Sequence, residues 1–215
     1  MSKLQAWFGG TFDPIHLGHI QSVQHLAQQI GLSKVMLMPN HVPPHRPQPQ
    51  ANAQQRLAML EIATAGNELF AIDTRELNKD TPSWSVESLR QIRQEQGDAP
   101  LAFIIGQDAL LTLNHWHCWT ELPRLCHLLV CVRPGYPHVH PDGQIQQWID
   151  QHRTTDLQTL QHQSSGHIYL AATPPFAISA TEIRHRLQQG KACDDMLPAG
   201  VAEYIRQTGL YRHQR

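Results

Sequence analysis

The chain has 215 residues, 40% of them hydrophobic, so it is long enough to bury a core and short enough to form a single domain over 1–215. Lys and Arg total 17 against 18 Asp and Glu, and the net charge of −1 excludes a global field that attracts nucleic acid or an acidic membrane surface. No stretch approaches the roughly 18 apolar residues of a membrane span, and residues 1–8 lack a signal-peptide pattern, so we expect a cytoplasmic protein.

The first half of the chain alternates short apolar runs with segments of helical period. Residues 4–8 form an apolar run that ends at two glycines, and apolar side chains at helical spacing follow over 17–30. This order predicts a strand, a glycine turn and a helix that stops at Gly31. Further strands are predicted at 34–38, 70–73 and 101–105, and further helices at 54–65 and 86–96.

The alternation continues through the second half. Strands are predicted at 128–132 and 167–171, helices at 181–189 and 200–207, and surface loops at 39–50, 134–142 and 154–165. Strands separated by helices along the whole chain predict an α/β fold, a doubly wound, Rossmann-like parallel sheet flanked by helices. In that architecture ligands bind beyond the carboxyl ends of the strands.

The cysteines suggest packing rather than a disulfide framework or a metal site. Cys118, Cys126, Cys131 and Cys193 form no CxxC pair, so we expect reduced thiols. The remaining alternative is a zinc site built from His115, His117, Cys118, Cys126 and His127. Zinc ligands normally come in two well-spaced pairs, and 15 histidines make chance clusters common, so we expect no metal held by the protein.

The most informative segment is GGTFDPIHLGH at residues 9–19, where the first predicted strand meets the first helix. Its glycines allow a tight turn close to a phosphate, and the helix start offers unpaired N–H groups and a positive dipole end. His16 and His19 lie three residues apart, which places both on one face of the first helical turn, and Gly18 leaves room for a ligand.

Two histidines beside a polyphosphate suit phosphoryl-type transfer. Their imidazoles can donate charge-assisted hydrogen bonds to an α-phosphate and a departing pyrophosphate, usually with Mg²⁺ bridging phosphate oxygens. A lone histidine more often packs or faces solvent, but here the glycine-rich context favours the functional interpretation. A dinucleotide-binding GxGxxG turn is excluded, because Thr11 replaces its second glycine.

Residues 9–19 resemble the signature of the nucleotidylyl transferase superfamily, and ISATEIR at residues 178–184 resembles its second ATP-binding motif. Ser179 or Thr181 is a suitable N-cap for the next helix. Arg184, one turn later, can bind a phosphate there; the alternative is that its side chain faces solvent. Asp108, two residues after Gly106, can accept hydrogen bonds from nucleotide hydroxyls, or alternatively it only caps the following helix. The resemblance implies catalytic roles for His16, His19 and Arg184, and ATP contacts from Gly9, Gly10, Thr11, Phe12, Gly18, Gly106, Asp108, Ile178, Ser179 and Thr181.

Within the superfamily the chain looks most like the bacterial nicotinate-nucleotide adenylyltransferases. The similarity lies in PNHVPPHR at 39–46, PSWS at 82–85, Trp116 and RPG at 133–135. A pyridine ring gains from stacking on an aromatic side chain, and its carboxylate suits a hydroxyl or a backbone N–H. Alternatively, the tryptophans are core or rim aromatics and the loop arginine is a solvated charge. The resemblance implies acceptor contacts from Asn40, His45, Arg46, Trp84, Ser85, Trp116, His117 and Arg133.

Two departures from the family pattern bear on the acceptor. The family often has Tyr-Thr where this chain has Trp84-Ser85, which keeps an aromatic ring and a hydroxyl, and an aromatic residue where this chain has His117. The resemblance implies ATP and nicotinate mononucleotide as substrates, with Mg²⁺ bound mainly through the ATP phosphates, and leaves monomer or dimer open. Rival hypotheses are a phosphopantetheine adenylyltransferase, a cytidylyltransferase, an aminoacyl-tRNA synthetase and a non-catalytic nucleotide sensor. The presence of His16, His19 and Arg184 together favours a catalyst over a sensor.

Overall fold

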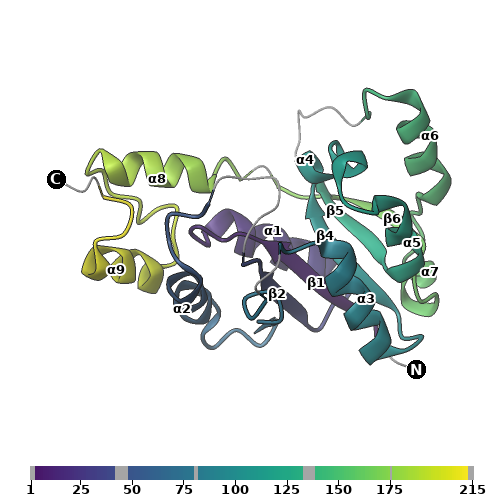
Figure 1. The fold of residues 1–215 in the computed structure, drawn as a ribbon, viewed down its shortest axis with the longest axis horizontal. Coiled ribbons are helices and arrows are strands. Elements are labelled where there is room, and N and C mark those ends of the chain that lie inside the picture. Colours follow the sequence, from purple (N-terminus) through teal and green to yellow (C-terminus); the bar gives the residue numbers. More distant parts are fainter. Residues whose placement is uncertain (1–2, 42–47, 80–81, 133–138, 175, 213–215) are drawn as a thin grey trace.

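A computed structural model describes residues 3–41, 48–79, 82–132, 139–174 and 176–212. Within these ranges, six parallel strands form one sheet in the order β3-β2-β1-β4-β5-β6 (Figure 1). The strands are β1 (Gln5–Gly10), β2 (Val35–Pro39), β3 (Phe70–Ile72), β4 (Leu101–Gly106), β5 (His127–Val132) and β6 (Ile168–Ala172). This arrangement confirms the predicted doubly wound α/β fold.

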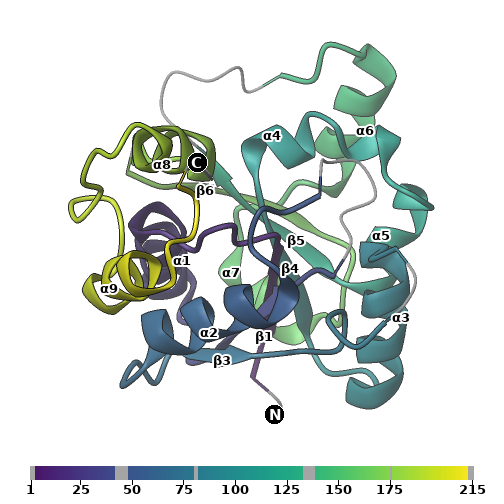
Figure 2. The same cartoon turned by 60° about the vertical axis from the view of Figure 1, so that its left-hand side comes forward.

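Helices cover both faces of the sheet (Figure 2). They are α1 (Leu17–Ile30), α2 (Ala53–Thr64), α3 (Ser85–Gln96), α4 (Gln107–Leu110), α5 (Leu122–Leu125), α6 (Gly143–His152), α7 (Leu157–His162), α8 (Ala180–Gln188) and α9 (Ala199–Thr208), with short 3-10 turns at Leu113–His115 and Trp119–Glu121. Side chains alternate along each strand, so Ala6 enters one core with α1, α2 and α9, whereas Trp7 enters a second core with α3 and α6. No helix within the described ranges is long and apolar enough to cross a membrane.

The predicted helix and strand positions agree with the structure to within one or two residues, and Gly31 ends α1 in a left-handed conformation with φ of 79°. The prediction of a loop at 154–165 was wrong, because it contains α7, capped by Asp156. Helix α6 was also missed. Helix α7 has six residues and buries only Leu160, so its apolar period is weak. Helix α6 does have a helical period, because Ile145 and Ile149 lie four residues apart on its buried face, but the sequence analysis did not recognise it.

The C-terminal segment closes one side of the molecule. Helices α8 and α9 lie together at one end of the molecule in Figure 1, and α9 packs beside α2. The Leu17 N–H, at the start of α1, donates to the Met196 carbonyl at 2.9 Å. The end of the chain is therefore joined to the segment where the first helix begins.

Candidate active site

The candidate site lies at the carboxyl ends of β1 and β4, which are neighbours in the sheet. The chain continues from β1 into α1, which packs in the first core, and from β4 into α4, whose Leu110 packs in the second core on the other face of the sheet. Adjacent strands that lead to opposite faces define a topological switch point, where α/β sheets bind their ligands. The two predicted ATP-binding segments, 9–19 and 106–108, thus meet at one edge of the sheet.

Gly9 and Gly10 lie in the strand rather than in the turn that the sequence predicted. They are the last two residues of β1, and neither has a positive φ. A Cβ at Gly9 would lie 2.7 Å from the Phe103 ring, and one at Gly10 would lie 2.9 Å from the Phe12 ring. The prediction that they form the turn was wrong, because the turn is made by Phe12, with φ of 50°, and the glycines admit neighbouring rings.

His16 and His19 form a reciprocal capping pair at the start of α1. His16 is the N-cap residue, and its Nδ1 accepts the His19 N–H at 3.3 Å, while His19 Nδ1 accepts the His16 N–H at 3.3 Å. The rings stack with centroids 3.6 Å apart. The residues are therefore together, as predicted, but through this capping box rather than through helical spacing.

The capping box fixes the tautomer of both rings. A Nδ1 atom that accepts a backbone N–H carries no hydrogen, so the hydrogen of each neutral imidazole is on Nε2. Two stacked imidazolium rings would also repel each other at this separation. Each ring is thus arranged as an Nε2–H donor, which can still form the predicted charge-assisted hydrogen bond because a phosphate acceptor carries the charge.

Phe12 and Gly18 support this pair. The Phe12 side chain is only 2% exposed and contacts His19 edge to face, with ring centroids 5.3 Å apart. The structure thus buries the Phe12 ring beneath the histidine pair, and the ATP contact expected of this residue stays a prediction. A Cβ at Gly18 would lie 3.0 Å from His16 Nδ1 and 3.3 Å from Ile178 Cβ, so this glycine lets the second motif approach the first.

The second motif lies against the first through Arg184. Ser179, rather than Thr181, caps α8, because its Oγ accepts the Glu182 N–H at 3.2 Å. Arg184 donates from Nη1 to the Asp13 carbonyl at 2.7 Å and from Nη2 to Thr181 Oγ1 at 3.4 Å. The alternative of a solvated arginine was wrong, since this side chain is 24% exposed and faces the first motif.

Asp13 is a central residue that the sequence analysis did not single out. It is 6% exposed, and its Oδ1 accepts the Tyr211 hydroxyl at 2.7 Å and the Ala51 N–H at 3.0 Å, while Oδ2 accepts the Gln50 N–H at 2.9 Å. Burial, and then the charge of Asp13, raise the pKa of Tyr211. Nothing in the local sequence connects Asp13 with a tyrosine 198 residues away.

Gly106 and Asp108 lie at the same edge of the sheet. Gly106 precedes α4 with φ of −78°, and a Cβ there would meet nothing within 4 Å, so the protein itself does not require this glycine. Asp108 is exposed in the first turn of α4, whose N-cap residue is Gly106. The alternative that Asp108 caps this helix was therefore wrong, and its carboxylate is open to solvent.

Five of the predicted acceptor residues are described, and Asn40 among them contacts the first ATP motif directly. The Asn40 N–H donates to the Gly10 carbonyl at 3.0 Å, and its Nδ2 donates to Thr11 Oγ1 at 3.2 Å. Trp84 precedes α3, Ser85 is its first residue, and the Trp84 and His117 ring centroids are 5.0 Å apart. Trp116 is half-buried and meets Phe103 edge to face at 6.5 Å. His45, Arg46 and Arg133 lie outside the described residues.

The cysteines and the buried histidine pack as ordinary core groups. The four thiols are free, and burial raises the pKa of Cys126 to about 12. His127 pairs its Nε2 with the Gln163 carbonyl at 2.9 Å, and its Nδ1 accepts the His167 N–H at 3.2 Å. Burial lowers the pKa of His127 to about 4. Within the described ranges, no three His, Cys, Asp or Glu side chains form a metal-ligating group.

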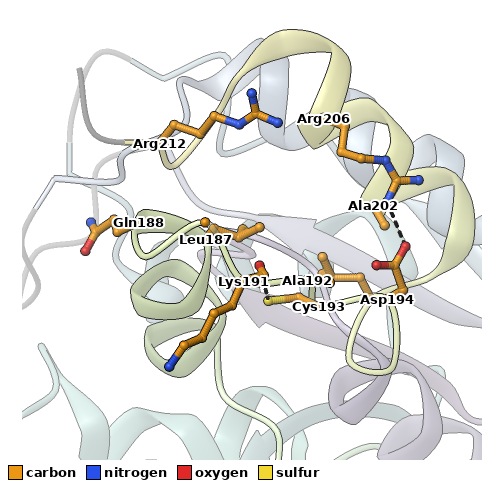
Figure 3. Close-up of a pocket in the computed structure, with 11 residues that line it drawn as sticks. Leu187, Gln188, Lys191, Ala192, Cys193, Asp194, Ala202, Arg206 and Arg212 are labelled. Carbon is orange, nitrogen blue, oxygen red and sulfur yellow. Dashed lines mark hydrogen bonds and ion pairs between the residues drawn. The ribbon is translucent and has the colours of Figure 1, made fainter. Parts of the chain in front are cut away.

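A cavity of about 540 Å³ lies elsewhere, between the end of α8 and α9 (Figure 3). Leu187, Lys191 and Arg206 line it, and Arg206 is paired with Asp194 at 2.7 Å. The candidate site is at the opposite end of α8, where Ser179 caps the helix. This cavity is therefore separate from the two motifs.

Comparisons with known proteins agree with this geometry. Residues 7–186 match the family described as Cytidylyltransferase-like. A probable nicotinate-nucleotide adenylyltransferase of Serratia proteamaculans (strain 568) is 60% identical over 97% of this chain and 96% of its own. One of Yersinia enterocolitica is 58% identical over the same shares. A solved structure of Plasmodium falciparum nicotinic acid mononucleotide adenylyltransferase complexed with NaAD covers 97% of both chains with a TM-score of 0.70. At 16% identity, it shows a shared fold.

Proposed function

The chain belongs to the cytidylyltransferase-like family and, within it, to the nicotinate-nucleotide adenylyltransferases, and on this premise we propose that it transfers the adenylyl group of ATP to nicotinate mononucleotide. The products are deamido-NAD and pyrophosphate, in a step of NAD biosynthesis. The observation that carries the proposal is the stacked His16–His19 pair with Arg184 beside it, at the switch point of the sheet.

The reaction we propose is a direct in-line displacement. An oxygen of the 5′-phosphate of nicotinate mononucleotide attacks the α-phosphorus of ATP, and the bond from that phosphorus to the α,β-bridging oxygen breaks as pyrophosphate leaves. No protein nucleophile takes part, because positioning and electrostatic stabilisation suffice for transfers of this kind.

The residues of the site have distinct parts in this step. The Nε2–H groups of His16 and His19 donate to oxygens of the α- and β-phosphates, where negative charge develops. Arg184, held by the Asp13 carbonyl, adds a fixed positive charge for the departing pyrophosphate. The start of α8 supplies further N–H donors to the triphosphate.

The acceptor is assigned to the adjoining segments. The rings of Trp84 and Trp116 provide surfaces for the pyridine ring, and the Ser85 hydroxyl and the backbone N–H of His117 suit its carboxylate. Asn40, next to the ATP-binding turn, suits the mononucleotide phosphate together with His45, Arg46 and Arg133. This assignment places the attacking phosphate beside the α-phosphate of ATP.

Magnesium is assigned to the substrate rather than to a protein cage. The carboxylate of Asp13 is already engaged by Tyr211 and two backbone N–H groups, so it is unsuited to a metal ion. Mg²⁺ prefers to keep several waters and to bind through phosphate oxygens. We therefore propose that it enters on the ATP phosphates.

The catalytic assignment is tested by His19→Ala. We expect kcat to fall by about a hundredfold or more, the effect of losing one preorganised donor. His25→Ala is the control, because His25 is an exposed residue of the same helix. An unchanged kcat in the His19 variant would refute the assigned role.

The in-line step has its own test. Labelled pyrophosphate should not exchange into ATP when the acceptor is omitted, because no adenylyl-enzyme forms. Exchange at the rate of turnover under these conditions would show a covalent intermediate and overturn the mechanism.

A further inference from the structure

Arg56 is a buried arginine beneath the candidate site. It belongs to α2 and is 1% exposed, and burial lowers its pKa while the charge of Asp13 opposes this effect. Its Nη1 donates to the Thr11 carbonyl at 2.7 Å, and its Nη2 donates to the His41 carbonyl at 3.3 Å. Burying a guanidinium costs desolvation free energy, so an apolar side chain would be more favourable at this position if its role were only to pack.

The two carbonyls belong to different substrate segments. Thr11 lies in the predicted ATP-binding turn between β1 and α1, and His41 follows Asn40 in the predicted acceptor loop after β2. Asn40 already joins these segments through two hydrogen bonds, to the Gly10 carbonyl and to Thr11 Oγ1. The Arg56 guanidinium adds a charged donor to each segment, because it donates to a backbone carbonyl of both.

His41 extends the connection to a third segment. Its N–H donates to the buried Ser83 Oγ at 3.1 Å, and its Nδ1 lies 2.8 Å from the Lys79 carbonyl. Ser83 adjoins Trp84 and Ser85, which are predicted to contact the acceptor. The carbonyl, N–H and ring of His41 are therefore each held by a different residue, and Arg56 connects this residue with the ATP-binding turn.

We propose that Arg56 is a positioning residue that fixes the ATP-binding turn and the acceptor loop at the separation required for in-line attack. The inference rests on the proposed function. A planar guanidinium presents its donors in a rigid fork, so it fixes the distance between two carbonyls, whereas a lysine ammonium is a point charge on a flexible stem. A misplacement of about 1 Å between reacting groups costs on the order of a hundredfold in rate.

The test compares Arg56→Lys with Arg93→Lys. Arg93 is also a partly buried arginine that clamps carbonyls, those of Leu125, Gly97, Ala99 and Ser164. These carbonyls precede β4, β5 and β6, so Arg93 lies at the opposite edge of the sheet from the site. Both changes keep the charge and remove the fork, but only one of them affects the two substrate segments.

Steady-state kinetics provide the first readout. We expect Arg56→Lys to lower kcat by about tenfold to a hundredfold, with KM for ATP and for nicotinate mononucleotide changed by less than about threefold, because each segment keeps its own ligand groups. Arg93→Lys should keep kcat within about twofold. If Arg56→Lys had the kcat of the wild type, only the positive charge of residue 56 beside Asp13 would matter, and the inference would be overturned.

Amide hydrogen exchange provides a second readout that does not depend on turnover. The N–H groups of Asn40 and His41 are hydrogen-bonded across the joined segments, so Arg56→Lys should speed their exchange by about tenfold or more, and Arg93→Lys should not. Unchanged exchange at both amides would overturn the inference whatever the protein catalyses. If the wild-type protein turned over no nicotinate mononucleotide but Arg56→Lys still exchanged these amides faster, the proposed function would be refuted, whereas the role of Arg56 in joining the two segments would stand.

Discussion

Tyr211→Phe removes one hydroxyl from a buried network at the end of the chain. The hydroxyl donates to Asp13 Oδ1 at 2.7 Å, and the two side chains are 5% and 6% exposed. The change keeps the ring, so it leaves no large cavity. Hydrogen bonds to charged groups contribute about 1.5–3 kcal/mol, and the lost donor is only partly replaced by the two backbone N–H groups that remain on Asp13. We therefore expect the free energy of unfolding to fall by about 2 kcal/mol.

Urea unfolding at pH 7 measures this loss. With a slope of about 2 kcal/mol per molar urea, the midpoint should fall by about 1 M. Tyr204→Phe is the matched control, because the described residues provide no hydrogen-bond partner for the half-buried Tyr204 hydroxyl, and it should change stability by less than about 0.5 kcal/mol. Equal midpoints for Tyr211→Phe and the wild type would refute the view that the chain end anchors the motif through Asp13.

Three further changes test other parts of the structure. His127 has a pKa of about 4 when folded and about 6.5 when unfolded, so its stability contribution is complete above pH 6.5 and is lost as the pH falls toward 4; urea unfolding should show roughly 2 kcal/mol less stability at pH 5 than at pH 7, and a smaller loss in His127→Gln. In Gly106→Ala the new methyl group meets no protein atom, so the free energy of unfolding should change by less than about 0.5 kcal/mol while KM for ATP rises. An unchanged KM would contradict the assignment of Gly106 to the ATP site. Gly18→Ala should displace His16 and lower kcat by roughly tenfold or more in the same assay, whereas wild-type kcat would show that the contact is not needed.

Features encoded by neighbouring residues were predictable from the sequence. The apolar runs gave the strands, and Gly31 and Ser179 ended or began helices where their conformational and hydrogen-bonding preferences favour it. The first and second motifs were expected to share a site, and the contact between Arg184 and the Asp13 carbonyl brings them together. Their catalytic and binding roles stay predictions.

Features that depend on distant or unusual contacts were not predictable. An N-cap is usually Ser, Thr, Asp or Asn, so no local pattern indicated that His16 caps α1 and that this contact determines the tautomer of its ring. The sequence analysis did not single out Arg56, and only the fold shows that its guanidinium donates to the Thr11 and His41 carbonyls, in the segments predicted to bind ATP and the acceptor. Tyr211 and Asp13 are 198 residues apart in the chain, so their contact depends on the tertiary fold.

The measurement that tests the central claim most directly is pyrophosphate release by the purified protein with ATP and Mg²⁺. Nicotinate mononucleotide, nicotinamide mononucleotide and phosphopantetheine are compared as acceptors at equal concentration. We predict a strong preference for nicotinate mononucleotide. Preference for another acceptor would contradict the assignment of Trp84, Ser85 and Trp116, and ATP binding without turnover of any acceptor would show a nucleotide sensor and contradict the proposed catalysis.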